Sequence, residues 1–409
     1  MKASPSYSTA RFLTRTFLLL LLTGAFAPNS FAQDTKQQRP RRVAGSSDQT
    51  PPGKDATGTP PDEVDEGDVV RVETQLVSVP AVITNSTGRP VVGLRRENFT
   101  VFEDGQPQSI SDFGTTEAPF EIALLLDTSG STRDDVALIR QAANSFIRAL
   151  RPRDRVAIIA FNTARKGNAL IATVDVLAPL TSDRKALQTG IENLGSANGT
   201  PFYDGLERII RDVFNGPPQE ESRGRRAVVA LTDGVDSTSQ TDFAAVRAKL
   251  ISSGVACYFI QVNTEDFVED RLLKDCEDDG RLSLSAKQLQ RYRVIFVPKA
   301  KSDDFSNFCQ MGPFERMQIS RDLYNLARRE MNDLAEVSGG RNFVAATLQD
   351  ARAAFAHVAN EIGTQYSLGY YPTNKARDGK LRLIRVELRG VPPKTQVRAR
   401  ESYFAPKGN

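Results

Sequence analysis

The sequence has very little of the two residue types that build soft-metal sites and most nucleophilic active sites. Its 409 residues include one histidine, His357, and three cysteines. One histidine and three cysteines are too few for histidine-rich metal sites, cysteine-based zinc clusters or folds that depend on several disulfides. Any Ser-His-Asp or Cys-His catalytic site would have to use His357 alone, so the sequence gives little support to that chemistry.

A strong excess of charge is also missing. The chain has 53 Lys and Arg residues and 50 Asp and Glu residues, a net charge of +3, which is too balanced to indicate a nucleic-acid-binding protein. Apolar residues make up 40% of the chain. This is an ordinary share for a globular protein, so the chain can form a sizeable core. At roughly 150 residues per domain, its length predicts two or three domains.

Long apolar runs are absent after the first thirty residues, and the run at the start is short. Basic residues precede the apolar stretch 17–22, and Ser30-Phe31-Ala32 has the small residues that signal peptidase requires. The stretch is well below the ~20 apolar residues that cross a bilayer, which favours cleavage over a membrane anchor. We interpret residues 1–32 as a signal peptide. We therefore expect a secreted or periplasmic protein without a transmembrane segment in its mature chain.

Residues 33–68 contain no aromatic residue and no Leu, Ile or Met, but several prolines. Such a segment cannot bury enough apolar surface to offset the entropy lost on ordering. We interpret it as a disordered linker.

Three blocks follow the linker. Residues 69–117 have the alternation and turn signals of short antiparallel strands, including a hairpin pattern at 101–106. Residues 118–363 alternate apolar strands with amphipathic helices, which predicts an α/β, doubly wound, mostly parallel sheet with functional loops at its carboxyl edge. Residues 364–409 return to strand. Neither flanking block is large enough to build a core alone, so we expect them to pair in one antiparallel β module.

Within the α/β block, residues 264–332 break the alternation with a charged, irregular stretch, which we interpret as an insertion. It holds Cys276 and Cys309, which in an oxidising compartment are candidates for a disulfide. Cys257 lies in an apolar strand, where a thiol acts as a small core side chain.

Three loops of the α/β block carry oxygen-bearing side chains. Asp127, Ser129 and Ser131 come directly after an apolar strand, Thr200 precedes a helix, and Asp233 ends another apolar strand. A helix N-cap explains the first loop taken alone. Three such loops at one edge of a parallel sheet instead predict a site for a hard divalent ion, Mg²⁺, Mn²⁺ or Ca²⁺, because these ions prefer oxygen ligands.

These loops resemble the metal-ion-dependent adhesion site (MIDAS) of the von Willebrand factor type A (VWA) domain, in which a DxSxS loop combines with a threonine loop and an aspartate loop. All five positions of that pattern are filled in this sequence. The segments 101–105 and 365–372 also resemble a bacterial, acidobacterial-type VWFA-related family. The resemblance implies a Rossmann-like VWA domain over about residues 120–363 and a function without catalysis.

In type A domains, hydroxyls and one carboxylate hold the ion, which keeps a position open for an outside oxygen. The resemblance therefore implies a cell-adhesion or protein-binding module whose partner supplies an Asp or Glu to a bound Mg²⁺. Asp204 and Asp236 are candidates for acids that lie behind the metal ligands or stabilise the loops that carry them. An equal alternative for both is a surface or helix-cap carboxylate.

Two other interpretations use the same residues. A structural scaffold whose metal site is occupied but unused fits the sequence as well. An aspartic protease is suggested by Leu126-Asp127-Thr128-Ser129-Gly130, but that chemistry needs two matched carboxylate loops. The only second candidate, Thr232-Asp233-Gly234, has a different order, and an amphipathic helix follows Ser131 where a protease would continue in β-structure.

Overall fold

The computed structural model describes residues 76–408, apart from positions 116, 130–135, 223, 266–267 and 270–283. All of them belong to one compact unit. The signal peptide 1–32 and the linker 33–68 lie outside the described residues and stay predictions. No helix in the described part of the chain is both long and apolar enough to cross a membrane.

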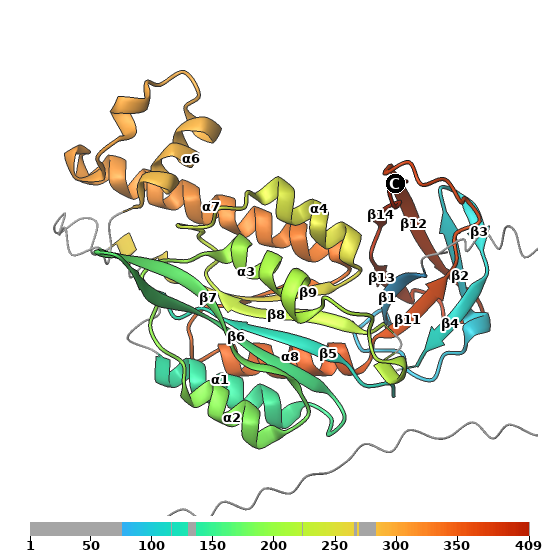
Figure 1. Ribbon diagram of the computed structural model, residues 1–409. Coiled ribbons are helices and arrows are strands. Elements are labelled where there is room, and N and C mark those ends of the chain that lie inside the picture. The colour runs from blue at the N-terminus through green and yellow to red at the C-terminus, as the bar shows by residue number, and fades with distance from the viewer. Residues whose placement is uncertain are drawn as a thin grey trace, which may run out of the picture. The chain divides into compact units, whose positions relative to one another are not determined.

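A six-stranded sheet forms the centre of this unit (Figure 1). Its order is β10-β9-β8-β5-β6-β7, and every neighbouring pair is parallel except β6 with β7. The strands are β5 (Glu121–Leu126), β6 (Arg155–Lys166), β7 (Ala169–Thr181), β8 (Arg226–Thr232), β9 (Ala256–Val262) and β10 (Arg341–Ala345).

Helices cover both faces of the sheet (Figure 1). One face carries α1 (Val136–Ala149), α2 (Arg184–Glu192) and α8 (Ala351–Gly363), and the other carries α3 (Phe202–Arg208), α4 (Phe243–Ser253) and α7 (Pro313–Ser338). Alternate residues of a strand point to opposite faces, so Leu124 packs in one core and Leu125 in the other. Burial on both faces explains why β5 is apolar throughout. The predicted doubly wound, mostly parallel sheet is confirmed.

The flanking β module consists of two four-stranded sheets, β13-β1-β11-β4 and β14-β12-β2-β3. Segments from both ends of the chain alternate in it, since β1 pairs with β11 and β13, and β2 pairs with β12. This confirms the predicted β module of mixed N- and C-terminal origin. The strands are β1 (Val77–Thr84), β2 (Phe99–Glu103), β3 (Gln106–Gln108), β4 (Ile110–Gly114), β11 (Tyr366–Tyr370), β12 (Leu381–Leu388), β13 (Gln396–Ala399) and β14 (Ser402–Phe404).

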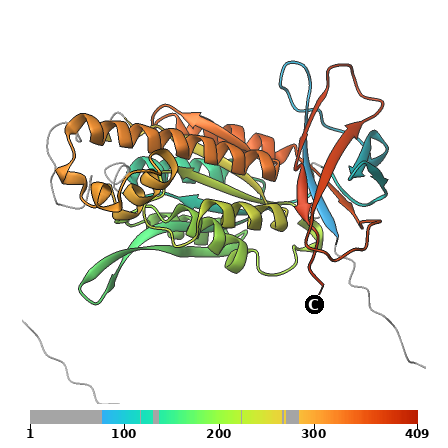
Figure 2. The ribbon, with the colours of Figure 1, turned by 90° about the horizontal axis from the view of Figure 1, so that it is seen from above.

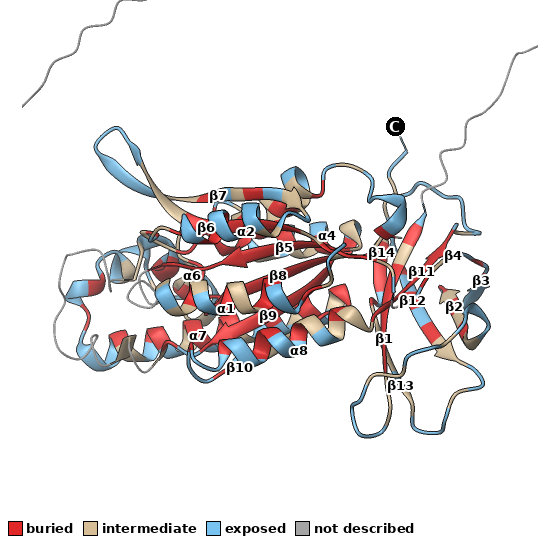
Figure 3. Ribbon diagram, turned by 90° about the horizontal axis from the view of Figure 1, so that it is seen from below, coloured by how far each residue is buried: buried red, intermediate tan, exposed pale blue. Residues whose placement is uncertain are grey.

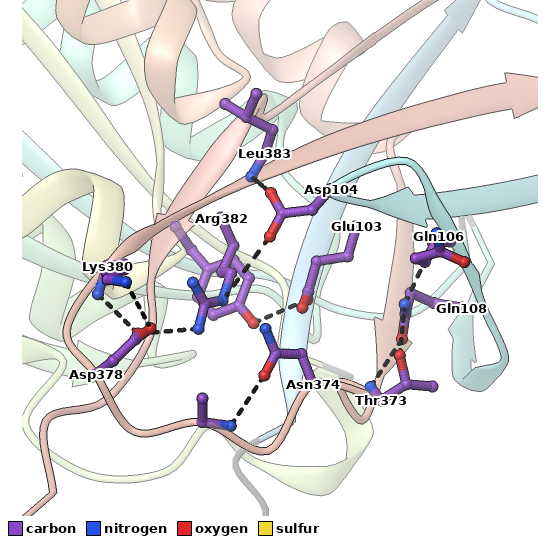
Figure 4. Close-up of polar contacts among 12 residues, drawn as sticks. Glu103, Asp104, Gln106, Gln108, Thr373, Asn374, Asp378, Lys380, Arg382 and Leu383 are labelled. Carbon is purple, nitrogen blue, oxygen red and sulfur yellow. Dashed lines mark hydrogen bonds and ion pairs between the residues drawn. The ribbon is translucent and has the colours of Figure 1, made fainter.

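The predicted hairpin joins β2 to β3 through Asp104 and Gly105, both with positive φ, as a tight two-residue turn requires. The Asp104 carboxylate accepts a hydrogen bond of 2.9 Å from the backbone N–H of Leu383 (Figure 4). Arg382 lies beside it and donates to Asp378 at 2.9 Å. Polar contacts of this kind connect the two ends of the chain within the module.

The stretch 264–332 is only partly separate from the sheet. It contains α6 (Ala286–Phe296), which packs with the N-terminal half of α7 around a small apolar cluster of its own. The C-terminal half of α7 is the crossover helix between β9 and β10, and its residues Met331 and Leu334 are buried in the main core. The predicted insertion therefore ends inside a core helix rather than before one.

Strand β7 is absent from the sequence-based prediction. It follows β6 through a turn at Gly167, which has φ 60°, and it forms the antiparallel edge of the sheet. Its apolar stretch 169–172 lies at the exposed or half-buried start of the strand, and only Val174 and Ala178 of β7 are buried.

Candidate metal site

The register of the sheet brings two acidic loops together. β5 and β8 are parallel neighbours, and Leu126 lies opposite Leu231 at the carboxyl ends of both strands. The chain continues from these residues into Asp127 and into Thr232-Asp233. The backbone N–H of Asp127 donates to Leu231 O at 3.0 Å, which extends the pairing by one residue. The predicted carboxylates therefore leave the sheet side by side.

Each carboxylate is fixed by the turn that it starts. Asp127 Oδ1 accepts a hydrogen bond of 2.9 Å from the N–H of Ser129, and Asp233 Oδ1 accepts one of 3.0 Å from the N–H of Val235. Such side-chain-to-backbone bonds two residues ahead are the usual conformation of Asp at a turn. Both side chains are buried, with exposed fractions of 1% and 3%. The turns therefore direct both carboxylates into the protein edge and not into bulk water.

The two carboxylates are buried and close enough to repel each other, so the electrostatic potential between them is negative. Burial, and after it the negative charge of Asp233, raise the pKa of Asp127 from its ordinary value of 3.8 to about 7. Hydrogen bonds from Ser129 and Thr232 act in the opposite direction. A cation between the two carboxylates would offset the repulsion from Asp233 that disfavours the charged form of Asp127.

Thr200 belongs to a loop that is bound to both acidic loops. The N–H of Ala197 donates to Thr128 O at 2.9 Å, and the N–H of Thr200 donates to the hydroxyl of Ser237 at 2.8 Å. Thr200 is buried, and its own hydroxyl makes no hydrogen bond with a described residue. The structure thus places Asp127, Ser129, Thr200 and Asp233 at one sheet edge. Ser131 lies outside the described residues.

The sequence model of the von Willebrand factor type A domain family matches residues 121–288, which begin with β5 and end in α6. The chain contains a von Willebrand factor type A domain. No curated protein matches the chain.

Several solved structures are similar to the chain at low identity. Conserved hypothetical protein BatB from Bacteroides thetaiotaomicron is 16% identical, and the match covers 59% of this chain and 98% of that protein with a TM-score of 0.34. A von Willebrand factor type A protein from Catenulispora acidiphila is 11% identical over 81% of this chain and 74% of its own, with a TM-score of 0.37. Proximal thread matrix protein 1 from the mussel byssus is 12% identical over 60% of this chain, with a TM-score of 0.37; the match covers 48% of that protein, about half its length.

Asp204 and Asp236, the two candidates for supporting acids, accept hydrogen bonds from backbone N–H groups. Asp236 accepts from the N–H of Phe202 at 2.9 Å and from Ser239, and therefore caps the start of α3. Asp204 accepts from the N–H groups of Gln240 and Thr241, each at 2.8 Å. The helix-cap interpretation therefore describes Asp236, and both carboxylates join α3, which follows Thr200, to the loop after Asp233.

Two further residues, Thr232 and Thr264, contact the candidate ligands, and Tyr324 contacts Thr264; none of the three belongs to the predicted ligand set. The Thr232 hydroxyl donates to Asp127 Oδ2 at 2.6 Å, and the Thr264 hydroxyl donates to Asp233 Oδ2 at 2.8 Å. Tyr324 on α7 lies 2.7 Å from the Thr264 oxygen. The Thr264 hydroxyl has a single proton, which it donates in the hydrogen bond to Asp233. The Tyr324 hydroxyl is therefore the donor in the bond between Tyr324 and Thr264. Thr232 is visible beside Asp233 in the sequence, whereas no local pattern marks Tyr324.

The donor set of the type A domain fits a hard cation. It consists of two carboxylates and neighbouring hydroxyls, the oxygen ligands that Mg²⁺, Mn²⁺ and Ca²⁺ take. No group of three or more His, Cys, Asp and Glu side chains suited to a metal occurs among the described residues. The thiols do not contribute: Cys257 is buried and free, Cys309 is disulfide-bonded, and Cys276 lies outside the described residues.

Proposed function

We propose that the type A domain of this chain binds a divalent cation, Mg²⁺ first, and holds a partner protein through that ion. The observation that carries the proposal is the pair of buried carboxylates, Asp127 and Asp233, at adjacent strand ends with a negative potential between them. The residues that would hold the ion are Asp127, Ser129, Ser131, Thr200 and Asp233.

Type A domains act in general as protein-interaction modules. A bound Mg²⁺ would supply a Lewis-acidic position for an oxygen from outside the chain. Few anionic ligands and several neutral hydroxyls leave the ion electrophilic, so a carboxylate of a partner Asp or Glu is the matching group. We propose that this contact occurs outside the cytoplasm, in the periplasm or at the exterior of a bacterial cell, as the leader peptide predicts.

The protease alternative finds little support in the geometry. Asp127 and Asp233 end parallel strands of an α/β sheet, whereas aspartic proteases are built almost wholly from β-structure. The Thr232 and Thr264 hydroxyls each donate to one of the two carboxylates, which holds both as hydrogen-bond acceptors. This arrangement suits charge pairing with a cation better than a proton shared between the acids.

The first test is Mg²⁺ binding by calorimetry to the full chain, to Thr200→Val and to Asp303→Asn. Thr200→Val removes a proposed ligand while keeping the shape of the side chain. Asp303→Asn is the matched control at an exposed position. We expect Thr200→Val to weaken Mg²⁺ binding at least about tenfold, whereas the control binds like the wild type. Equal binding by all three proteins, or no binding by the wild type, would exclude this site.

The second test separates a binding module from a scaffold. The immobilised chain is exposed to the envelope and exported proteins of its native cells in Mg²⁺, with and without EDTA. A partner that is retained in Mg²⁺, released by EDTA and not retained by Thr200→Val supports binding through the metal. Partners that remain bound in EDTA would favour the scaffold interpretation.

A further inference from the structure

Strands β6 and β7 extend far beyond the sheet to which they belong. The last residue pair between β5 and β6 is Leu126 with Ala160, yet β6 continues to Lys166. Beyond that point only β7 accompanies it, in an antiparallel pairing that runs from Asn162–Thr173 to Lys166–Ala169. At about 3.3 Å per residue this two-stranded projection, residues 162–173, reaches ~20 Å past the sheet edge. We call it the β6–β7 arm; Figure 2 and Figure 3 show it standing away from the other elements.

The base of the arm is bonded to the loops of the candidate metal site. The Thr128 hydroxyl, next to Asp127, donates to Phe161 O at 3.0 Å. The Thr163 hydroxyl donates to Ser196 O at 3.2 Å and accepts from the N–H of Asn198 at 2.8 Å. The loop 195–200 thus carries Thr200 at one end and holds the arm at the other. The arm therefore rises from the same edge of the sheet as the candidate ligands.

The outer part of the arm has no role in the core. Leu170 and Ile171 have exposed fractions of 55% and 38%. Arg165 and Lys166 are also exposed, and neither makes an ion pair within the described part of the chain. β7 is also the last strand of its sheet, so one of its edges is open. Exposed apolar side chains on a long open edge strand mark an interaction surface or an aggregation site.

A pocket at the foot of the arm continues this surface toward Thr200. It encloses about 410 Å³ between β7 and α3, and Thr173, Pro201 and Arg208 are among its lining residues. Pro201 directly follows the candidate ligand Thr200. The hydroxyl oxygen of Thr173 is buried without a hydrogen-bond partner among the described residues, so it is open to an ordered water or to a polar group of a bound molecule. Metal site, pocket and arm therefore adjoin one another at one end of the domain.

We infer that the β6–β7 arm is the second contact site for the protein partner of the metal, an inference that rests on the proposed function. The partner segment that fits is an extended peptide. Its apolar side chains would contact Leu170 and Ile171, and its acidic side chains would pair with Arg165 and Lys166. A further Asp or Glu of the same segment reaches the ion. An open strand edge binds extended peptides through backbone hydrogen bonds, and side chains add the selectivity. Charge complementarity selects an acidic partner over a second copy of this chain, whose arm is itself basic.

The probe is a library of short random peptides on phage, selected on the immobilised full chain in Mg²⁺. Selected sequences are synthesised, and their affinities are measured for the wild type and three variants. Leu170→Ser with Ile171→Thr alters the apolar contact, and Arg165→Gln with Lys166→Gln removes the charges. Val344→Ser is the matched control, because Val344 is 73% exposed on β10 at the opposite edge of the sheet. Mg²⁺ affinity is measured separately for every protein.

We expect selected peptides that combine acidic and apolar residues and bind only with Mg²⁺. The apolar arm variant should lose about tenfold in peptide affinity, equal to about 1.4 kcal/mol, and the charge variant should lose its salt dependence. Mg²⁺ affinity and the Val344→Ser control should not change.

Three results would contradict the inference in distinguishable ways. Magnesium-dependent peptides that bind both arm variants like the wild type would exclude the arm and leave the proposed function intact. Absence of any magnesium-dependent peptide, with no Mg²⁺ binding, would exclude the proposed function and the arm with it. A dimer in solution that the apolar arm variant converts to monomer would assign the arm to a second copy of the chain.

Discussion

The hydroxyl of Thr232 donates a hydrogen bond of 2.6 Å to Oδ2 of Asp127, although 105 residues separate the two along the chain. The same hydroxyl accepts from the N–H of Gly234 at 2.9 Å, so one side chain orients Asp127 and closes the turn that carries Asp233. The parallel register of β5 and β8 makes this contact possible. The pairing of β5 with β8 and the Thr232 hydroxyl therefore hold the two acidic loops together as one unit.

Replacement of Asp127 tests whether this unit serves the metal or the fold. Asp127→Ala should abolish Mg²⁺ binding while the protein keeps its secondary structure, because the site lies at the sheet edge. In EDTA the variant should unfold at the same or a higher temperature than the wild type, since a buried charge repelled by Asp233 is gone. Calorimetry and thermal unfolding followed by circular dichroism measure the two effects. An unfolded Asp127→Ala protein would show instead that the metal is structural.

The pH dependence of the metal-free protein tests the pKa of Asp127. Its pKa is 3.8 ordinarily and about 7 in the folded protein. Between these values the unfolded chain releases the proton while the folded protein retains it, so this group lowers stability as pH rises from about 4 to 7. The loss should be on the order of a few kcal/mol. Urea unfolding in EDTA at pH 5 and pH 8, for the wild type and for Asp127→Asn, isolates this contribution.

The same titration predicts that Mg²⁺ affinity increases with pH up to about 7, because protons compete with the ion for Asp127. Asp127→Asn should lose the stability difference between the two pH values that this carboxyl causes. An identical pH dependence of stability in both proteins would contradict the raised pKa.

A third prediction concerns the chain of hydroxyls from α7 to Asp233. Tyr324→Phe removes the donor that fixes the Thr264 hydroxyl, and Thr264 in turn fixes Asp233 Oδ2. Loss of a residue that orients a ligand typically weakens metal binding by about 10- to 100-fold. We expect the lower end of this range for Tyr324→Phe, and a larger loss for Thr264→Val.

Two matched variants make this measurement specific. Thr264→Ser keeps the hydroxyl and should restore binding relative to Thr264→Val. Tyr292→Phe removes another tyrosine hydroxyl of the same region, one that contacts Asp322 at 3.3 Å, and should leave Mg²⁺ affinity unchanged. If Tyr324→Phe lowers thermal stability without affecting Mg²⁺ affinity, the hydroxyl chain has only a structural role.

The sequence predicts those parts of the fold whose physical cause is local. The apolar run 122–126 followed by Asp127 indicates a strand covered on both faces with a functional loop at its end, and register then brings Asp233 beside it. β7 escapes prediction although residues 169–172 are all apolar, because they are exposed or half-buried and the strand is placed by its antiparallel pairing with β6. Tyr324 also escapes prediction, since only the packing of a long helix brings it to Thr264.

The three cysteines allow a prediction about covalent structure. Cys309 is disulfide-bonded and Cys257 is free, so the sequence-based pairing of Cys276 with Cys309 accounts for every thiol. Burial raises the pKa of Cys257 to about 12, which makes its thiol unreactive in the folded protein. Iodoacetamide should therefore label no cysteine in the native, unreduced chain and only Cys257 after unfolding in denaturant. Peptide mapping by mass spectrometry should yield one linked pair, Cys276 with Cys309. Labelling of Cys276 before reduction would contradict the pairing, because that thiol would then be free in the folded chain.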